Sequence, residues 1–168
     1  MTAEFLVAAA VFLAAAALTF RALRARPAVR VGTFVMRLPD GWYEAEREPG
    51  AHCYRRRVEG SGELRVSLQP PLAGRVRSGR RAEQELARLV AGLGADLDLG
   101  ERLALTSGRC ALGVYATALC KSERHGLLQF WLIPAEATVF ASYTMGSLDA
   151  VKQDLAEAMQ IMRQVELR

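Results

Sequence analysis

The sequence is poor in the residues that build metal and catalytic centres. It has two histidines, His52 and His125, and three cysteines, Cys53, Cys110 and Cys120. The odd number of cysteines excludes a complete internal disulfide framework. These residues lack CxxC or HxxxH spacing, and the neighbours His52 and Cys53 point to opposite faces if they lie in a strand. We therefore expect no metal site and no cofactor.

Cysteine chemistry has equally little support. Cys110 and Cys120 are expected to end one strand whose ten residues span roughly 33 Å, whereas the Cα atoms of a disulfide lie about 4.4–6.8 Å apart. A Cys–His nucleophilic pair also needs a third group that orients the histidine. Cys120 and His125 flank one polar turn, but the sequence indicates no third group. We expect buried free thiols and no catalytic residues, so the protein is predicted not to be an enzyme.

Lysine is nearly absent. Lys121 and Lys152 are the only lysines, so the formal net charge of +4 comes from arginine. The arginines are interleaved with Asp and Glu over most of the chain, and no basic stripe indicates nucleic-acid binding. The loop 74–81 carries four arginines and two glycines but fits neither a P-loop nor a dinucleotide fingerprint. We interpret it, together with Arg55–Arg57, as a solvated basic surface, which would touch anionic lipid headgroups if the domain is cytoplasmic.

A long apolar run lies near the N-terminus. Every residue from Phe5 to Phe20 is apolar except Thr19. Sixteen helical residues span about 24 Å against a hydrocarbon core of about 30 Å, and the arginines that follow the run snorkel to the interface. The run has no polar face, which a buried core helix would show. Residues 1–20 are therefore predicted to be a transmembrane anchor that enters the lipid bilayer through residues 5–20.

Two topologies of this membrane segment remain open. The arginines all follow the run, so the positive-inside rule places the domain in the cytoplasm, behind a single pass through the inner membrane. If the run acts as a signal sequence instead, the domain is periplasmic; the positive charge that a signal peptide carries before its apolar run is missing here. Residues 21–31 are basic, contain Pro27 and lack periodicity, so they are predicted to be a linker to a domain over 32–168.

The domain is predicted to contain seven strands and two amphipathic helices. Strands are expected over the ranges 33–38, 51–58, 63–69, 103–106, 110–120, 127–133 and 138–145. Ser107-Gly108 is assigned to a turn. Helices are expected over 78–93, capped by Ser78, and over 148–167, capped by Ser147. The order of elements has no βαβ alternation, so we expect an α+β fold with an antiparallel sheet of six or seven strands packed with two helices.

The domain resembles the PsbP-like α/β sandwich over residues 31 to 168. The likeness is carried by the opening Phe34-x-Met36-x-Leu38-Pro39-Asp40-Gly41-Trp42, the long hairpin that begins at Ser107-Gly108, the strand end Tyr143-Thr144-Met145 and the closing amphipathic helix. Similar proteins include DcrB-like envelope proteins and the adaptor chaperones of secreted toxic effectors. The resemblance implies a non-catalytic scaffold that binds a partner. Those adaptors are soluble, whereas this chain carries the predicted anchor.

One face of the predicted sheet is mixed in character. The leucines and valine of the strand 63–69 are expected to share an apolar face with Leu128, Phe130 and Leu132, against which the helices pack. The opposite face is expected to combine aromatic rings with hydroxyl and amide groups, a composition suited to recognition unless a helix or loop covers it. We predict that this face binds a protein partner through Arg65, Ser67, Gln69, Tyr115, Gln129, Trp131, Phe140 and Ser142.

Two functions fit these observations. The first is a membrane-anchored adaptor, chaperone or assembly subunit of an envelope or secretion complex. The second is an immunity-type protein that occludes a toxin or enzyme through its arginine-rich loops. An enzyme would instead need His52 or His125 in a cleft beside a cysteine or a carboxylate.

Overall fold

The computed structural model describes residues 28–48, 50–59, 61–74, 76–145 and 151–167. The elements in these residues are β1 (Ala28–Val31), β2 (Phe34–Arg37), β3 (Trp42–Glu48), β4 (Ala51–Arg56), β5 (Glu63–Gln69), α2 (Gly79–Gly92), β6 (Leu99–Cys110), β7 (Gly113–Ser122), β8 (Gly126–Pro134), β9 (Thr138–Thr144), α3 (Val151–Arg163) and β10 (Glu166–Leu167).

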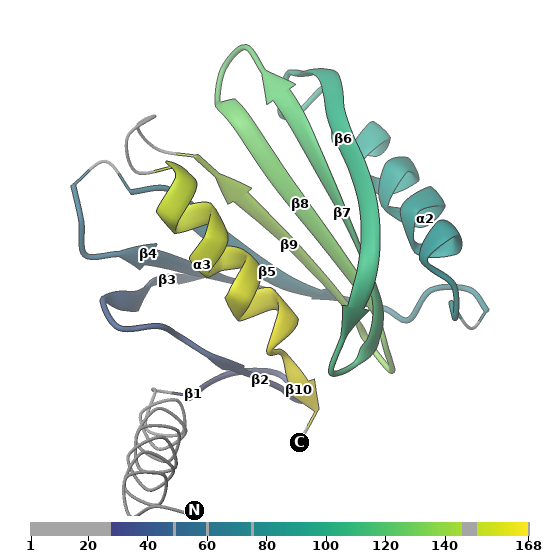
Figure 1. Cartoon of the computed structure of the whole chain (residues 1–168), viewed down its shortest axis with the longest axis horizontal. Coiled ribbons are helices and arrows are strands. Elements are labelled where there is room, and N and C mark those ends of the chain that lie inside the picture. The colour runs from purple at the N-terminus through teal and green to yellow at the C-terminus, as the bar shows by residue number, and fades with distance from the viewer. Residues whose placement is uncertain (1–27, 49, 60, 75, 146–150, 168) are drawn as a thin grey trace, which may run out of the picture.

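Seven strands form one antiparallel sheet in the order β3-β4-β5-β9-β8-β7-β6, and β1, β2 and β10 form a small second sheet. The helix α2 packs on one face against β6, β7 and β8, and α3 lies on the opposite face across β4 and β5 (Figure 1). The predicted fold class is confirmed: an antiparallel sheet with two helices.

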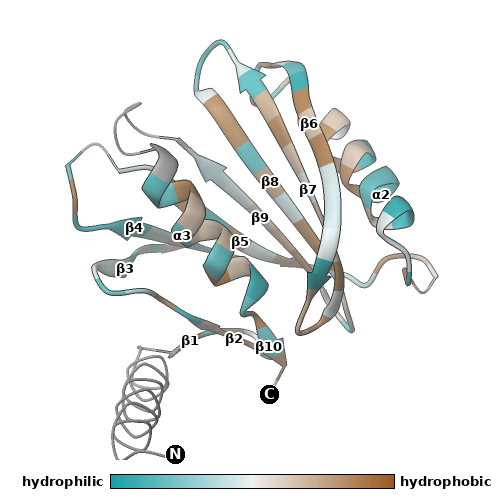
Figure 2. Cartoon of the chain, viewed as in Figure 1, coloured by the Kyte–Doolittle hydropathy of each residue, from teal (hydrophilic) through white to brown (hydrophobic). Residues whose placement is uncertain are grey.

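Each face of the large sheet buries its own core. The core on the α3 side includes Trp42, Tyr54, Trp131, Tyr143 and Ile161. The core on the α2 side includes Ala82, Leu86, Val90, Cys120 and Phe130. Because both faces of β8 are covered, this strand is apolar along most of its length rather than alternating, as Figure 2 shows by colour.

The helix α2 follows the sequence prediction closely. Ser78 has extended backbone angles, and its hydroxyl accepts a hydrogen bond from the amide of Arg81 at 3.3 Å, as expected of an N-cap. Its residues Ala82, Leu86 and Val90 form the apolar stripe of an amphipathic helix and are buried against the sheet. The capping residue and the apolar stripe therefore place this helix correctly.

Part of the predicted linker belongs to the folded domain. Residues 28–31, which the sequence analysis assigns to the linker, form β1 and pair with β2 from Ala28↔Arg37 to Val31↔Phe34. The predicted anchor and the rest of the linker lie outside the described residues. In the part of the chain that the structure describes, no helix has both the length and the hydropathy to cross a membrane.

The hairpin of β6 and β7 corrects a second prediction. Ser107-Gly108 is not a turn, because β6 continues to Cys110 and Gly108 pairs with Tyr115. The Tyr115 ring lies directly over Gly108, where a β-carbon would meet it. The turn falls at Ala111-Leu112 instead. Cys110 and Cys120 therefore lie on different strands. All three cysteines are free, and Cys53 and Cys120 are buried as expected, whereas Cys110 is only half-buried.

Two further corrections concern other ends of elements. A strand not predicted from the sequence, β3, occupies 42–48 and pairs with β4. The last helix ends at Arg163 rather than near Leu167, because Glu166 and Leu167 pair with β2 as β10. The predicted cap Ser147 lies outside the described residues.

Candidate binding surface

The predicted recognition face is split between the two sides of the sheet. Ser67 pairs with Phe140, and Phe140 pairs with Leu132, so these three share the α2 side. Ala141 pairs with both Val66 and Trp131, so the latter two share the α3 side. The prediction that Leu64, Val66 and Leu68 share one face of the sheet with Leu128, Phe130 and Leu132 is wrong. The prediction of a single recognition face on the opposite side is wrong for the same reason.

Three of the eight predicted partner-binding residues lie on the α3 side. Trp131 and Gln129 are 1% and 7% exposed, and Trp131 belongs to the core there. Tyr115 packs at the edge of that core, with the guanidinium carbon of Arg163 5.8 Å from the centre of its ring. Trp131 and Gln129 are thus inaccessible to a partner in the folded domain.

The other five predicted residues remain together on the α2 side, along β5 and β9. We call Arg65, Ser67, Gln69, Phe140 and Ser142 the outer strip. Each is exposed or half-buried. Three of its four polar side chains have partners: Arg65 pairs with Glu48, the Ser67 hydroxyl donates to the Phe140 carbonyl at 3.3 Å, and Gln69 Nε2 lies 3.4 Å from Ser67 Oγ. The outer strip is accessible, but most of its polar side chains already have partners within the domain.

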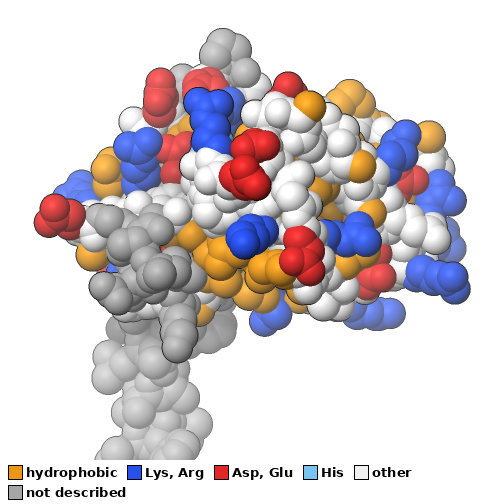
Figure 3. All heavy atoms as spheres, turned by 90° about the horizontal axis from the view of Figure 1, so that it is seen from above, with side chains coloured by type: hydrophobic (Ala, Val, Ile, Leu, Met, Phe, Trp, Pro, Cys, Tyr) orange, Lys and Arg blue, Asp and Glu red, His pale blue; other side chains and the backbone are white. Residues whose placement is uncertain are grey.

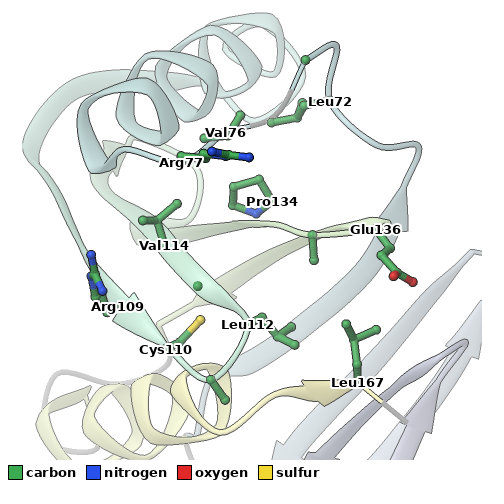
Figure 4. Close-up of a pocket in the computed structure, with 14 residues that line it drawn as sticks. Leu72, Val76, Arg77, Arg109, Cys110, Leu112, Val114, Pro134, Glu136 and Leu167 are labelled. Carbon is green, nitrogen blue, oxygen red and sulfur yellow. The ribbon is translucent and has the colours of Figure 1, made fainter.

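An open pocket of about 610 Å³ lies at the end of the sheet where β5 stops. Four segments far apart in the sequence line it: the loop before α2, the β6–β7 turn, the β8–β9 turn and β10 (Figure 4). Two glycines with positive φ, Gly74 at 79° and Gly113 at 120°, shape these turns. The apolar side chains of the lining are Leu72, Val76, Leu112, Val114, Pro134 and Leu167.

The charged side chains of the pocket are arranged unevenly. Arg77 extends toward Pro134, and Arg109 and Glu136 lie at opposite ends of the lining (Figure 4). Neither Arg77 nor Arg109 forms an ion pair with any described residue. Figure 3 shows Lys and Arg side chains gathered at the right-hand end of the molecule, which α2 occupies in Figure 1. The pocket therefore combines apolar walls with two arginines that have no ion pair to a described residue and with one acid, Glu136.

The pocket lining contains one thiol, that of Cys110. Burial raises the pKa of the Cys110 thiol, and hydrogen bonds from the backbone at Leu112 and Gly113 oppose this only in part. The thiolate, which is the nucleophilic form, is thereby disfavoured. No histidine is among the described residues that line the pocket. What the lining offers a ligand is apolar contact, two guanidinium groups and the carboxylate of Glu136.

A buried polar cluster joins α3 to the sheet. The Asp154 carboxylate, 0% exposed, accepts hydrogen bonds from Arg56 Nη1 at 3.0 Å, the Tyr143 hydroxyl at 3.0 Å and the Gly62 amide at 3.3 Å. Burial and the neighbouring carboxylate of Asp154 raise the pKa of Tyr143. Because these groups bind one another and the Asp154 carboxylate is closed off from water, the cluster fixes α3 rather than exposing a site.

The other candidate residues from the sequence, the histidines and the cysteines, do not come together in one site. His52 Nδ1 lies 2.7 Å from Glu44 Oε1, whereas Cys53 pairs with Arg65 on the other face, as the alternation predicts. Cys120 belongs to the α2-side core, and the amide of His125 donates to Ser122 in the β7–β8 turn. Within the described ranges, no three His, Cys, Asp or Glu residues are grouped so as to hold a metal ion.

Sequence reasoning found only part of the pocket. It placed Gly74 and Arg77 in a basic loop but did not bring Arg109, Glu136 or Leu167 to the same place. The predicted turn at Ser107-Gly108 puts Arg109 away from the end of the sheet. A hairpin turn at Ala111-Leu112-Gly113 was the sequence signal that would have placed Arg109 at the end of the sheet.

No protein-family model matches the sequence, and no curated protein matches it. The fold is similar to the solution structure of cyanobacterial PsbP (CyanoP) from Synechocystis sp. PCC 6803, with a TM-score of 0.57, 11% identity, and coverage of 81% of this chain and 87% of that chain. A crystal structure from Bacteroides thetaiotaomicron VPI-5482 matches with a TM-score of 0.44 and 18% identity. The match covers 81% of this chain but only 45% of that chain. The likeness to CyanoP shows that the chain has a PsbP-like sandwich fold.

Proposed function

We propose that this chain is a non-catalytic, membrane-anchored binding protein, which acts as an adaptor, chaperone or assembly subunit of an envelope or secretion complex. The observation that carries the proposal is the open pocket at the end of the sheet, with apolar walls and two guanidinium groups that lack ionic partners among the described residues. Concave apolar sites with a few polar groups are typical of binding sites.

The anchor and its orientation are parts of the proposal that rest on the sequence. Residues 5–20 have the composition of a membrane segment, and the arginines after them favour a cytoplasmic domain, with a periplasmic domain if the run is a signal sequence. Either placement leaves the pocket free to bind a protein on one side of the inner membrane. We expect the partner to be a protein of the same complex.

The alternative function, an immunity-type inhibitor, has less support. It relies on the arginine-rich loops, and of these only the loop 74–81 keeps arginines, Arg77 and Arg80, without an ion pair to a described residue. The three residues of the run Arg55–Arg57 are each engaged within the domain. Arg55 pairs with Glu63, Arg56 pairs with the buried Asp154, and Arg57 lies over the Tyr43 ring at 5.5 Å. Binding a toxin through this run would require at least some of these contacts to be broken.

Site-specific photo-crosslinking of the full-length protein in its native membranes tests the proposal. Ala111 is exposed and lines the pocket, and Val58, 47% exposed, lies in the β4–β5 connection at the opposite end of β5. With p-benzoylphenylalanine in place of Ala111, we expect one defined protein adduct, which is absent when the photoreactive residue replaces Val58. The same adducts at both positions, or none at position 111, would refute a partner at the pocket.

A further inference from the structure

We infer that the pocket binds an acidic segment of the partner protein, which places an apolar side chain between Leu112 and Val114 and sets its carboxylates beside Arg77 and Arg109. This inference rests on the proposed function and names the chemistry of the partner. Its starting point is the charge of the lining: two exposed guanidinium groups with no ion pair among the described residues, on walls that are otherwise largely apolar.

The start of α2 adds to the positive potential at this end of the molecule. Arg80 and Arg81 occupy the first turn, which contains no acidic residue, although a helix N-terminus favours acids. Arg81 is compensated by Glu85 at 3.3 Å, whereas Arg80 has no ion pair with any described residue. The local sequence thus holds like charges at the positive end of the helix dipole, an arrangement that a carboxylate from outside would relieve.

The openness of the pocket favours a segment of a larger molecule over a small ligand. Gly74, Ala111, Gly113 and Glu136 are all exposed although they line it. A drug-sized ligand usually buries most of its surface, whereas these exposed residues leave one side of the hollow open to solvent. A bilayer surface is flat on this scale and would touch the protruding turns rather than fill the hollow between them. A side chain that projects from a protein segment does fill it.

Glu136 gives the bound segment a direction. It lies at the end of the lining opposite Arg109 (Figure 4), where it repels carboxylates. The acidic residues of the partner are therefore held toward Arg77 and Arg109, where each guanidinium presents a fork of donors that matches a carboxylate.

The test uses the full-length protein in detergent and a fluorescein-labelled peptide of alternating glutamate and leucine, with binding followed by fluorescence anisotropy. The double variant Arg77→Gln/Arg109→Gln is expected to bind this peptide roughly tenfold more weakly or worse. The matched control is Arg102→Gln, the same change at an exposed position on β6, and it should retain affinity within about twofold. Peptides with glutamine for glutamate, or serine for leucine, should both bind more weakly than the parent.

Three results would overturn the inference: equal affinity for the glutamate and glutamine peptides, an unchanged affinity in the double variant, or displacement of the peptide by sn-glycerol 3-phosphate at concentrations similar to that of the peptide. The last would assign the pocket to phosphate groups such as those of lipids. The crosslinking at position 111 separates this failure from failure of the proposed function. An adduct there whose partner segment is neutral or basic would keep the binding role and reject the acidic segment, whereas no adduct would reject the binding role.

Discussion

Arg56 on β4 and Asp154 on α3 form an ion pair across the interface between the sheet and the helix, with Nη1 and Oδ1 3.0 Å apart. The Asp154 side chain is completely buried, and that of Arg56 is 18% exposed. The Nε group of Arg56 also lies 3.5 Å from Glu157 Oε2, which accepts a hydrogen bond from the Trp42 indole at 2.6 Å. One guanidinium therefore links two acids of α3 to the sheet.

Replacement of Asp154 by alanine is expected to destabilise the domain strongly. The change leaves the Arg56 guanidinium, the Tyr143 hydroxyl and the Gly62 amide without their shared acceptor. Breaking one side of a buried pair costs about 3–5 kcal/mol. Urea unfolding of the full-length protein in detergent measures the free energy. The control Asp96→Ala, at an exposed acid, should change it by less than about 0.5 kcal/mol; equal effects of the two changes would contradict the role of the ion pair.

Alkaline pH is expected to weaken the domain through Tyr143. Its pKa is raised above the ordinary value of 10.0 by burial and by the Asp154 carboxylate. In the unfolded chain the phenol ionises near pH 10, while in the folded domain it stays protonated, so its contribution to stability is complete below that pH and is lost above it. The midpoint of urea unfolding should therefore fall from about pH 10 upward.

The variant Tyr143→Phe separates this effect from other alkaline changes. It should be less stable than the wild type at neutral pH by about 1–2 kcal/mol, since Asp154 and Gly62 each lose a partner. Its unfolding midpoint should decline less steeply above pH 10. The exposed ring of Tyr43 supplies the control, and Tyr43→Phe should keep the wild-type slope. An identical slope in Tyr143→Phe would show that this phenol is not the responsible group.

Much of the fold was predictable because its local signals agree with its packing. The alternation of β5 and the capped, amphipathic α2 both came from patterns that burial on one face imposes. Which residues of β8 point to which face of the sheet was not predictable in this way. Both of its faces are buried, so it is apolar nearly throughout, and its sequence does not say which residues face which side of the sheet. Only pairing with β9 settles that, and pairing is a long-range property.

The same limit applies to the pocket and the buried cluster. The basic run Arg55–Arg57 looks like one surface patch, but strand alternation sends Arg56 toward α3 and Arg55 to the opposite face. Asp154 occupies the stripe that buries Ala158 and Ile161, and an acid at such a position was a readable sign of a buried pair. The pocket brings together four segments, and the sequence carries no signal for their meeting.

Trp131 is a core residue, and its replacement should act on stability rather than on recognition. The indole is 1% exposed on the α3 side of the sheet. Trp131→Ala is expected to cost about 3–5 kcal/mol through the cavity it leaves, measured by urea unfolding. Ser142→Ala, in the outer strip, should cost less than about 0.5 kcal/mol. A stable, folded Trp131→Ala protein that has lost partner binding would return this residue to the recognition surface.

Replacement of glycine by alanine should change the stability of the domain in opposite directions at Gly62 and Gly92. A β-carbon at Gly62 would overlap the Thr144 carbonyl oxygen and the Tyr143 hydroxyl, beside the buried Asp154. Neither the strand backbone nor the fixed ring can move aside freely, so Gly62→Ala is expected to destabilise by about 2 kcal/mol or more. At Gly92, the last residue of α2, no heavy atom lies within 4 Å of the added carbon. Gly92→Ala should therefore stabilise by up to about 1 kcal/mol, because alanine has the higher helix propensity. Urea unfolding of both variants beside the wild type measures the two shifts, and shifts of the same sign would contradict the close packing around Gly62.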